Sequence, residues 1–296
     1  MNSNRMRRAG ILLTLLLLTP WLQAAPVMVS GDWLEPRLGQ PGLVIVDMSV
    51  GDAQYQRFHL PGAVRLPYQA LVQKRRDGVS VRIDDGRLAA ILGILGITPE
   101  DHVVIYDDMG GLNAARLFWE LERIGHKQVS VLDGGLVRWI LDRRPVDNRQ
   151  VQRPRVRYAL PEGGRDNDAA LAQVRNAMET GKPLLLDVRT EQEYRGKPRV
   201  ARSGHVPGAR FWPWDQAVDF DAGFVARPAD ELRASLAAAG AEKGRPVITY
   251  CRTGHRAARA YLTLRRLGFD QVKVYDGSMA EWSRNPDLPM KQGMEP

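Results

Sequence analysis

The feature that most constrains the fold of this 296-residue chain is an internal repeat with a spacing of roughly 140 residues. Six landmarks recur in the same order in both halves, and they include short apolar runs and the pattern His-x-Pro-Gly-Ala. The pairs are residues 43–47 with 184–188, 55–63 with 194–209, 103–107 with 247–251, 124–126 with 267–269, 129–135 with 272–278, and Trp139 with Trp282. The chain is therefore expected to fold as two tandem copies of one domain.

Each copy alternates short apolar runs, rich in β-branched residues, with longer amphipathic segments. The short runs lack strict alternation of polar and apolar residues, which predicts strands that are buried on both faces. Such strands are typical of a parallel sheet covered by helices. Helices are predicted at residues 113–124, 229–239 and 257–267. The predicted fold class is α/β, with two tandem domains that each hold a central parallel sheet flanked by helices.

The domain boundaries follow from composition. Residues 151–168 are rich in Arg, Pro and Gly and show no clear period, so they are predicted to be the interdomain linker. The first domain then covers residues 25–150 and the second covers 169–296. Hydrophobic content of 44% and charged content of 26% are ordinary for a soluble globular protein.

Residues 1–24 have the pattern of a secretory signal peptide. Arg5, Arg7 and Arg8 form a basic region, an apolar run follows at residues 11–18, and a cut is predicted between Ala24 and Ala25. A retained membrane anchor is the alternative, but the run is shorter than the about 20 residues that a span needs. Export to the periplasm is expected, without stable membrane insertion after processing. Both Sec and twin-arginine export remain open.

Charge and histidine usage exclude several kinds of partner. The formal net charge is +8, and removal of residues 1–24, which hold three arginines and no acids, lowers it to +5. The charge is spread along the chain, so it favours small anions and indicates no nucleic-acid partner. The five histidines have no ligand spacing, so neither a metal nor another cofactor is expected.

Cys251 is the only cysteine, and it opens the run Cys-Arg-Thr-Gly-His-Arg. It stands between the predicted strand 247–250 and the predicted helix 257–267. The helix N-terminus offers free N–H groups and partial positive charge, and Arg252 and Arg256 add full charges. Both effects favour the thiolate, which is the nucleophilic form. A buried, unreactive cysteine is the alternative, but so many cationic neighbours argue against it.

The remaining loop residues suggest how an anion would be held. Backbone N–H groups that converge on the sulfur would form a nest for a thiolate or a persulfide without any metal. Arg256 could orient an oxyanion by paired hydrogen bonds, with Arg252 at the rim. Gly254 lets the loop turn tightly, and Thr253 completes the predicted binding loop. His255 either tunes the local charge or is a solvated side chain.

The spacing of the loop favours sulfur chemistry over phosphate chemistry. Cysteine phosphatases place five residues between the cysteine and the arginine, whereas four residues separate Cys251 from Arg256. A shorter loop makes a smaller nest, which suits one sulfur atom better than a phosphoryl group. An arsenate or phosphate-ester enzyme on the same frame is therefore disfavoured.

The first copy keeps this frame but lacks the nucleophile. Asp107 occupies the place of Cys251, and residues 107–113 form an acidic loop that is one residue longer before its helix. The first half is therefore expected to be catalytically inactive and to form a wall or lid for the second.

These motifs together resemble the two-domain rhodaneses, a family of sulfurtransferases. The resemblance rests on Asp-Val-Arg at 187–189, Gly-His-Val-Pro-Gly-Ala at 204–209, the loop 251–256, and Tyr-Asp-Gly at 275–277. It implies an inactive first domain, a catalytic second domain, and a reaction in two displacements. The Cys251 thiolate would take the outer sulfur of a donor such as thiosulfate, and the persulfide would pass it to cyanide or another thiophile.

The resemblance also bears on the supporting residues and on the donor. Asp187 and Arg189, at a strand end, are expected to orient loops near the site. Arg252 favours thiosulfate, because mercaptopyruvate enzymes of this family tend to have small residues after the cysteine. Glu193 departs from the two-domain pattern, which has arginine there, and Arg195 is the candidate replacement.

Two other functions remain open at this stage. One is a 3-mercaptopyruvate sulfurtransferase, which differs only in its donor. The other is a persulfide carrier that hands sulfur to a partner protein with little turnover of free donors. The expected partners are a small anionic sulfur donor and a thiophilic acceptor, and the acceptor can be a small molecule or a protein.

Overall fold

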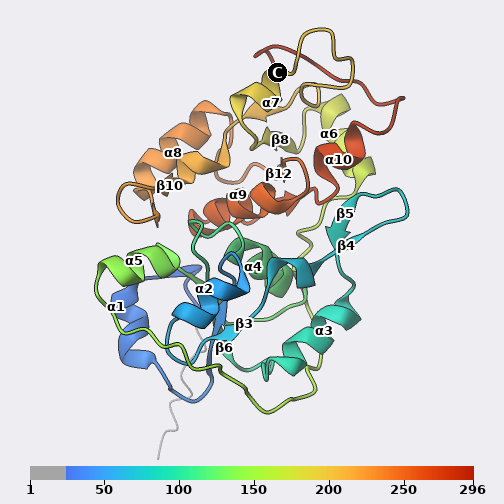
Figure 1. Cartoon of the computed structure of the whole chain (residues 1–296). Coiled ribbons are helices and arrows are strands. Elements are labelled where there is room, and N and C mark those ends of the chain that lie inside the picture. Colours follow the sequence, from blue (N-terminus) through green and yellow to red (C-terminus); the bar gives the residue numbers. More distant parts are fainter. Residues whose placement is uncertain (1–24) are drawn as a thin grey trace, which may run out of the picture.

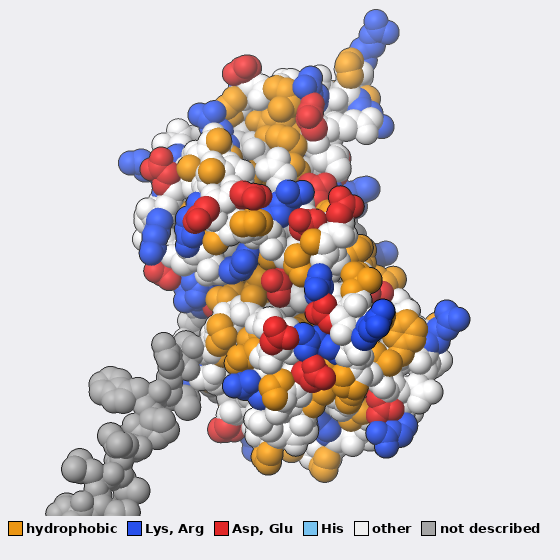
Figure 2. Space-filling model, turned by 90° about the vertical axis from the view of Figure 1, so that its left-hand side faces the viewer, with side chains coloured by type: hydrophobic (Ala, Val, Ile, Leu, Met, Phe, Trp, Pro, Cys, Tyr) orange, Lys and Arg blue, Asp and Glu red, His pale blue; other side chains and the backbone are white. Residues whose placement is uncertain are grey.

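The computed structural model describes residues 25–296, and the predicted signal peptide lies outside the described residues. Two α/β domains are stacked on each other, the first in the lower half of Figure 1 and the second in the upper half. Within residues 25–296, no helix has the length and apolar character needed to cross a bilayer. On the face drawn in Figure 2, basic and acidic side chains are interspersed.

The first domain is built on a five-stranded parallel sheet with the order β1-β7-β6-β2-β3. Its strands are β1 (Met28–Val29), β2 (Leu43–Asp47), β3 (Val64–Arg65), β6 (His102–Tyr106) and β7 (Val129–Leu132). Its helices are α1 (Gly31–Leu34), η1 (Glu35–Arg37), α2 (Asp52–Arg57), η2 (Tyr68–Leu71), α3 (Asp85–Ile94), α4 (Ala114–Arg123) and α5 (Gly135–Leu141), and β4 (Val72–Lys74) pairs with β5 (Ser80–Arg82) in an antiparallel hairpin.

The second domain repeats this plan with a four-stranded parallel sheet in the order β13-β12-β8-β9. Its strands are β8 (Leu184–Asp187), β9 (Arg210–Phe211), β12 (Val247–Tyr250) and β13 (Val272–Val274). Its helices are α6 (Leu171–Thr180), α7 (Glu191–Arg195), η3 (Trp214–Ala217), α8 (Ala229–Ala238), α9 (His255–Arg266) and α10 (Ser278–Trp282), and β10 (Val218–Asp219) pairs with β11 (Val225–Ala226) in a hairpin.

Both faces of each sheet are covered, as the unbroken apolar runs predict. In β2, Val44 and Val46 join one buried cluster, which also contains residues of α3 and α4. Ile45 points to the other face and joins a cluster that includes Leu136 and Trp139 of α5. Two-sided burial is the reason why these strands show no polar alternation. The predicted fold class is confirmed.

The two domains share one core through helices α4 and α9, which pack together at the centre of Figure 1. Phe118 and Tyr261 lie with their ring centroids 6.4 Å apart across this contact. A single buried cluster contains residues of both sheets. Asn167 links the two helices. Its backbone carbonyl accepts a hydrogen bond from Trp119 Nε1 at 2.9 Å, and its side-chain Nδ2 donates one to the Tyr261 hydroxyl at 3.0 Å.

The repeat is also visible in the domain interface, where a hairpin of each domain contacts the other domain. The backbone N–H of Arg82, in β5, donates to Asp276 of the second domain at 2.5 Å. The backbone N–H of Ala226, in β11, donates to Asp133 of the first domain at 2.7 Å. Asp133 and Asp276 occupy equivalent positions in the two copies. The hairpin of each domain therefore contacts the equivalent loop of the other domain.

Candidate active site

Cys251 lies directly after β12, at the carboxyl edge of the second sheet, and is followed by the N-terminus of α9. Its side chain is fully buried, with 0% exposure. Gly254 precedes α9 with φ +77°, and a Cβ there would lie 2.1 Å from Asp276 Oδ1. Glycine is therefore required at this position by its conformation and by the space available. The helix begins at His255, two residues earlier than predicted, because Gly254 completes the turn.

Ser278 anchors the cysteine loop at both ends. Its Oγ accepts from the backbone N–H of Cys251 and from that of Gly254, each at 3.1 Å, and donates to the Tyr275 carbonyl at 2.7 Å. Ser278 has φ +49°, a strained value for a residue other than glycine, and the equivalent Gly135 has φ +50°. Two loop amides are thus bound to one hydroxyl oxygen. This role of Ser278 is not among the predictions from the sequence, although the difference between Gly135 and Ser278 at equivalent positions of the repeat is a signal for it.

Arg256 forms a bidentate ion pair with Glu193. Its Nη1 and Nη2 lie 2.6 Å and 2.9 Å from the two Glu193 carboxylate oxygens. Thr190 also donates to Glu193 through its N–H and its hydroxyl. Burial alone would raise the pKa of Glu193, but the hydrogen bonds from Arg256 and Thr190 outweigh it and hold that pKa at about 2. Glu193, which departs from the two-domain rhodanese pattern, is therefore matched by Arg256 within the cysteine loop.

A pocket of about 480 Å³ opens beside the cysteine loop. Cations outnumber acids in its lining, which includes Arg189, Arg202, Lys197 and Arg252 together with Glu193. The Arg252 side chain is exposed, whereas Thr253 is half-buried. Of the predicted binding residues, Arg252 thus lines an open pocket whose charged residues are mostly cationic. Such a lining attracts small anions.

The predicted supporting residues separate into two groups. Arg189 binds Asp187 through Nε and Nη2, at 2.9 Å and 2.6 Å, and donates to the Gly204 carbonyl at 2.8 Å. This buried pair therefore connects the end of β8 to the loop around Gly204. Arg195, in contrast, is exposed and forms an ion pair with Glu191 at 2.6 Å.

The first domain reaches the cysteine loop through two side chains. His255 Nε2 lies 2.8 Å from Asn113 Oδ1, and the rings of Tyr68 and His255 lie 4.2 Å apart between centroids. Burial, together with the charges of Arg116 and Arg256, lowers the pKa of His255 to about 4. His255 is therefore neutral near pH 7 and is packed in the domain interface, not solvated. Sequence reasoning did not find Tyr68 or Asn113.

Tyr68 is close enough to the cysteine loop to interact electrostatically with Cys251. Burial, with contributions from nearby charges that include Cys251, raises the pKa of Tyr68 to about 12. Its phenol is therefore protonated near pH 7. Arg256 also lies within electrostatic reach of Cys251. The buried sulfur is thus surrounded by groups from both domains.

The equivalent loop of the first domain holds an anion of its own. The buried carboxylate of Asp107 accepts four backbone hydrogen bonds, from Met109, Gly111, Asn113 and Ala114, over 2.7–2.9 Å. This loop is therefore a nest of N–H groups that is already filled by its own side chain. The acidic character of this loop is predicted from the sequence, whereas the convergence of its amides on Asp107 is not.

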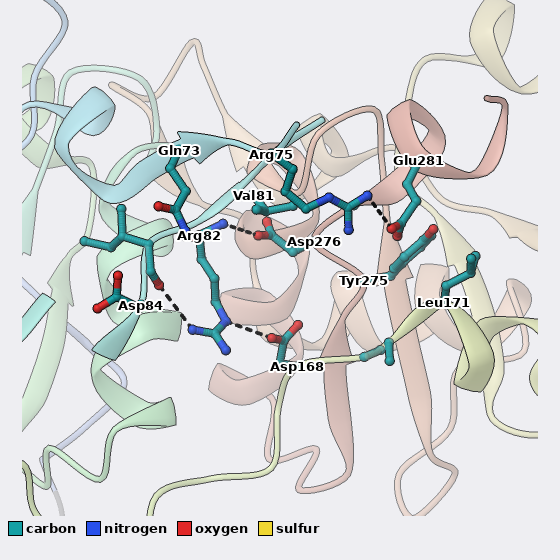
Figure 3. Close-up of a pocket in the computed structure, with 14 residues that line it drawn as sticks. Gln73, Arg75, Val81, Arg82, Asp84, Asp168, Leu171, Tyr275, Asp276 and Glu281 are labelled. Atoms are coloured by element: carbon teal, nitrogen blue, oxygen red, sulfur yellow. Dashed lines mark hydrogen bonds and ion pairs between the residues drawn. The ribbon is translucent and has the colours of Figure 1, made fainter. Parts of the chain in front are cut away.

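The β4–β5 hairpin faces Tyr275, Asp276 and Glu281 of the second domain (Figure 3). Arg75 pairs with Glu281 of α10 at 2.6 Å, and Arg82 pairs with Asp168 at 2.8 Å. A cavity of about 540 Å³ lies between these pairs and is lined by residues of both domains. Asp276 and Gly277, which precede Ser278, line this cavity, whereas Cys251 does not. Within residues 25–296, no group of three or more His, Cys, Asp or Glu side chains is arranged to hold a metal ion.

Comparison with known families agrees with the geometry of the loop and with the repeat. The family model described as "Rhodanese-like domain" matches residues 30–142 and again residues 170–285. The chain belongs to the rhodanese-like family. The resemblance inferred from the motifs is thereby confirmed, and each copy of the repeat is one rhodanese-like domain.

Curated relatives are similar over most of their length. The chain is 33% identical to "Sulfur carrier protein TtuD" of Thermus thermophilus, with 91% of this chain and 98% of the relative covered. It is 35% identical to a "Thiosulfate sulfurtransferase" of Pseudomonas aeruginosa, with 90% and 97% covered. Among solved structures, SseA from Escherichia coli, described as one of the 3-mercaptopyruvate sulfotransferases, has a TM-score of 0.75 at 26% identity, with 86% and 99% covered.

Proposed function

We propose that this protein is a sulfurtransferase that takes sulfane sulfur from thiosulfate and carries it on Cys251. The observation that carries the proposal is the Cys251 loop itself. The chain's single thiol lies at the carboxyl edge of a rhodanese-like sheet, on a loop tied down by Ser278, beside a pocket with a mostly cationic lining. The curated name of the Pseudomonas aeruginosa relative supports the same activity.

The reaction proceeds in two displacements. The Cys251 thiolate attacks the outer sulfur of thiosulfate, the S–S bond of thiosulfate breaks, and sulfite leaves with the bonding electrons. Cys251 then holds a persulfide. Cyanide or a thiolate attacks the terminal sulfur, the persulfide bond breaks, and the Cys251 thiolate is regenerated.

The charges around the pocket favour thiosulfate as the donor. Arg252 and Lys197 line the pocket beside the loop. A dianionic donor gains more from these cations than a monocarboxylate does. The opposing contribution is Glu193, but its charge is largely neutralised by Arg256. The similarity to SseA makes 3-mercaptopyruvate the second candidate donor, and the similarity to TtuD makes a sulfur-carrier role the alternative function.

Turnover and mass measurements on one preparation separate these functions. Purified protein incubated with thiosulfate is expected to gain the mass of one sulfur atom, and to form thiocyanate steadily when cyanide is added. The ratio of kcat/KM values for thiosulfate and 3-mercaptopyruvate identifies the donor. A mass gain without steady turnover would identify a carrier instead.

The matched control is Cys251→Ser, which removes the only thiol in the chain. This variant is expected to keep the fold and to lose both the mass gain and thiocyanate formation. Thiocyanate formation by Cys251→Ser near the wild-type rate would overturn the proposal.

A further inference from the structure

The active loop and its inactive counterpart are physically connected, although they belong to different domains. Asn113 closes the inactive loop, where its backbone N–H donates to Asp107 Oδ2 at 2.7 Å. Its side chain crosses the domain interface to His255, the first residue of α9, at 2.8 Å. One residue thus takes part in both loops.

The orientation of the Asn113 amide is fixed by a second hydrogen bond. Its Nδ2 donates to the carbonyl of Met48 at 2.8 Å, so Oδ1 is the atom that faces His255. Asn113 is 5% exposed, so water does not replace these hydrogen bonds of its side-chain amide. Because Oδ1 is an acceptor only, the imidazole must carry its proton on Nε2.

Tyr68 holds the same imidazole from a second element of the first domain. Its ring lies against that of His255 with an interplanar angle of 36°. The charged groups that face His255 are Arg116 of α4 and Arg256 of α9, and both disfavour a protonated imidazole. His255 is therefore fixed in position by the hydrogen bond and the ring contact, and it is kept neutral by its surroundings.

We propose that the inactive loop is a positioning device for the active one: Asp107 shapes it so that Asn113, together with Tyr68, holds His255 as a neutral imidazole protonated on Nε2. Because His255 opens α9 immediately after Gly254, fixing its ring also fixes the end of the Cys251 loop. The net positive charge of that loop then comes from Arg252, because Arg256 is paired with Glu193. Only the activity readout of this inference rests on the proposed function.

The direct test is nitrogen NMR of the histidine rings. His255→Gln assigns the His255 signals by their disappearance. In the wild type, His255 is expected to be the Nε2-protonated tautomer and to titrate at about 4. In Asn113→Ala, a mixture of tautomers is expected, because the acceptor that selects the Nε2 proton is lost. The titration is expected to stay low, because burial and the charges of Arg116 and Arg256 remain.

Asn148→Ala is the matched control, because Asn148 is an exposed asparagine in the same part of the chain. It is expected to leave the His255 signals unchanged. His255 signals in Asn113→Ala that match those of the wild type would overturn the proposal. If Asn113→Ala does not fold, Asn113→Asp takes its place, since a carboxylate next to His255 is expected to raise the pKa of that imidazole and move the same signals.

Turnover provides a second readout. A contact with a purely structural role would not produce the changes in kcat and in pH dependence that are expected here. Asn113→Ala is expected to lower kcat by roughly ten- to a hundredfold, because the cysteine loop is no longer held in place, with a smaller change in KM. In Asn113→Asp, the loss of activity toward acid is expected to begin at higher pH than in the wild type. Tyr68→Phe keeps the ring contact and is expected to leave the His255 titration unchanged, whereas Tyr68→Ala shifts it.

These outcomes separate the inference from the proposed function. A wild type without thiosulfate turnover refutes the proposed donor, but the NMR comparison still decides whether Asn113 holds His255. An unchanged pH profile in Asn113→Asp, together with unchanged NMR signals, refutes the positioning role even if wild-type turnover is high.

Discussion

Cys251 and Asp107 occupy equivalent positions, and each is completely buried. The two loops differ in what their backbone N–H groups bind. Burial raises the pKa of the Asp107 carboxyl group, and four backbone N–H groups oppose that shift by replacing its lost hydration. At Cys251, two of the loop's amides are instead bound to Ser278. A single substitution therefore does not convert one loop into the other.

The first residue-scale prediction is that Asp107→Cys in a Cys251→Ser background gains no appreciable sulfurtransferase activity. The longer loop is shaped around a two-oxygen carboxylate, Asp108 follows where Arg252 would stand, and Gly135 replaces the Ser278 hydroxyl. Thiocyanate formation is the measurement. Recovery of about a tenth of the wild-type rate would show that the loop frame alone is sufficient.

The second prediction concerns Ser278→Ala, which leaves two buried amides without their acceptor. Each unsatisfied buried donor costs about 1–3 kcal/mol, so with two donors we expect the free energy of unfolding to fall by about 2–6 kcal/mol. The thiocyanate rate is expected to fall as well, because the ends of the cysteine loop are no longer tied together. Urea unfolding and turnover measure the two effects. A stability within 0.5 kcal/mol of the wild type, roughly the range for neutral surface changes, would contradict the anchoring role.

The third prediction uses the pH dependence of Glu193. Its pKa is about 2 in the folded protein, below the ordinary value of 4.5, so the folded state favours the charged form. The resulting stability is fully present above pH 4.5 and is lost as the pH falls toward 2. In Glu193→Gln, this acid-dependent part disappears. The stability difference between wild type and variant is therefore expected to narrow as unfolding is followed from pH 5 to pH 3, and a constant difference would contradict the ion pair with Arg256.

At the scale of elements, the strands were the most predictable parts of the chain. The boundaries of β2 and β12 agree with the apolar runs at 43–47 and 247–250, because two-sided burial leaves an unbroken apolar pattern in the sequence. Helix α9 begins earlier than predicted, since the left-handed conformation of Gly254 ends the loop at once. The contact between Asn113 and His255 joins residues 142 positions apart, and no periodic pattern encodes it.

Helix α4 shows how an element comes to serve two domains. All residues from Ala114 to Leu121 are buried, including Arg116 and Glu120. Arg116 crosses the interface to Asp276, whose carboxylate also accepts from the N–H of Arg82. The sequence pattern identified this helix, but the burial of its charged side chains follows only from the second domain packing against it.

At the scale of the whole molecule, we propose that the protein is exported and that the mature chain begins at Ala25. The basic and then apolar pattern of residues 1–24 supports this proposal. N-terminal sequencing of protein from an extracytoplasmic fraction is expected to read Ala-Pro-Val-Met. A chain that keeps Met1 and is confined to the cytosol would contradict it.

The two hairpins make each copy of the repeat depend on contacts with the other. Residues Ala257 to Leu264 of α9 are all buried, and the first-domain hairpin donates a hydrogen bond to Asp276, two residues before Ser278. A chain cut within residues 151–168 would leave two halves with exposed cores and an unsupported cysteine loop. The inactive copy thus completes the core of the catalytic domain and supports its cysteine loop.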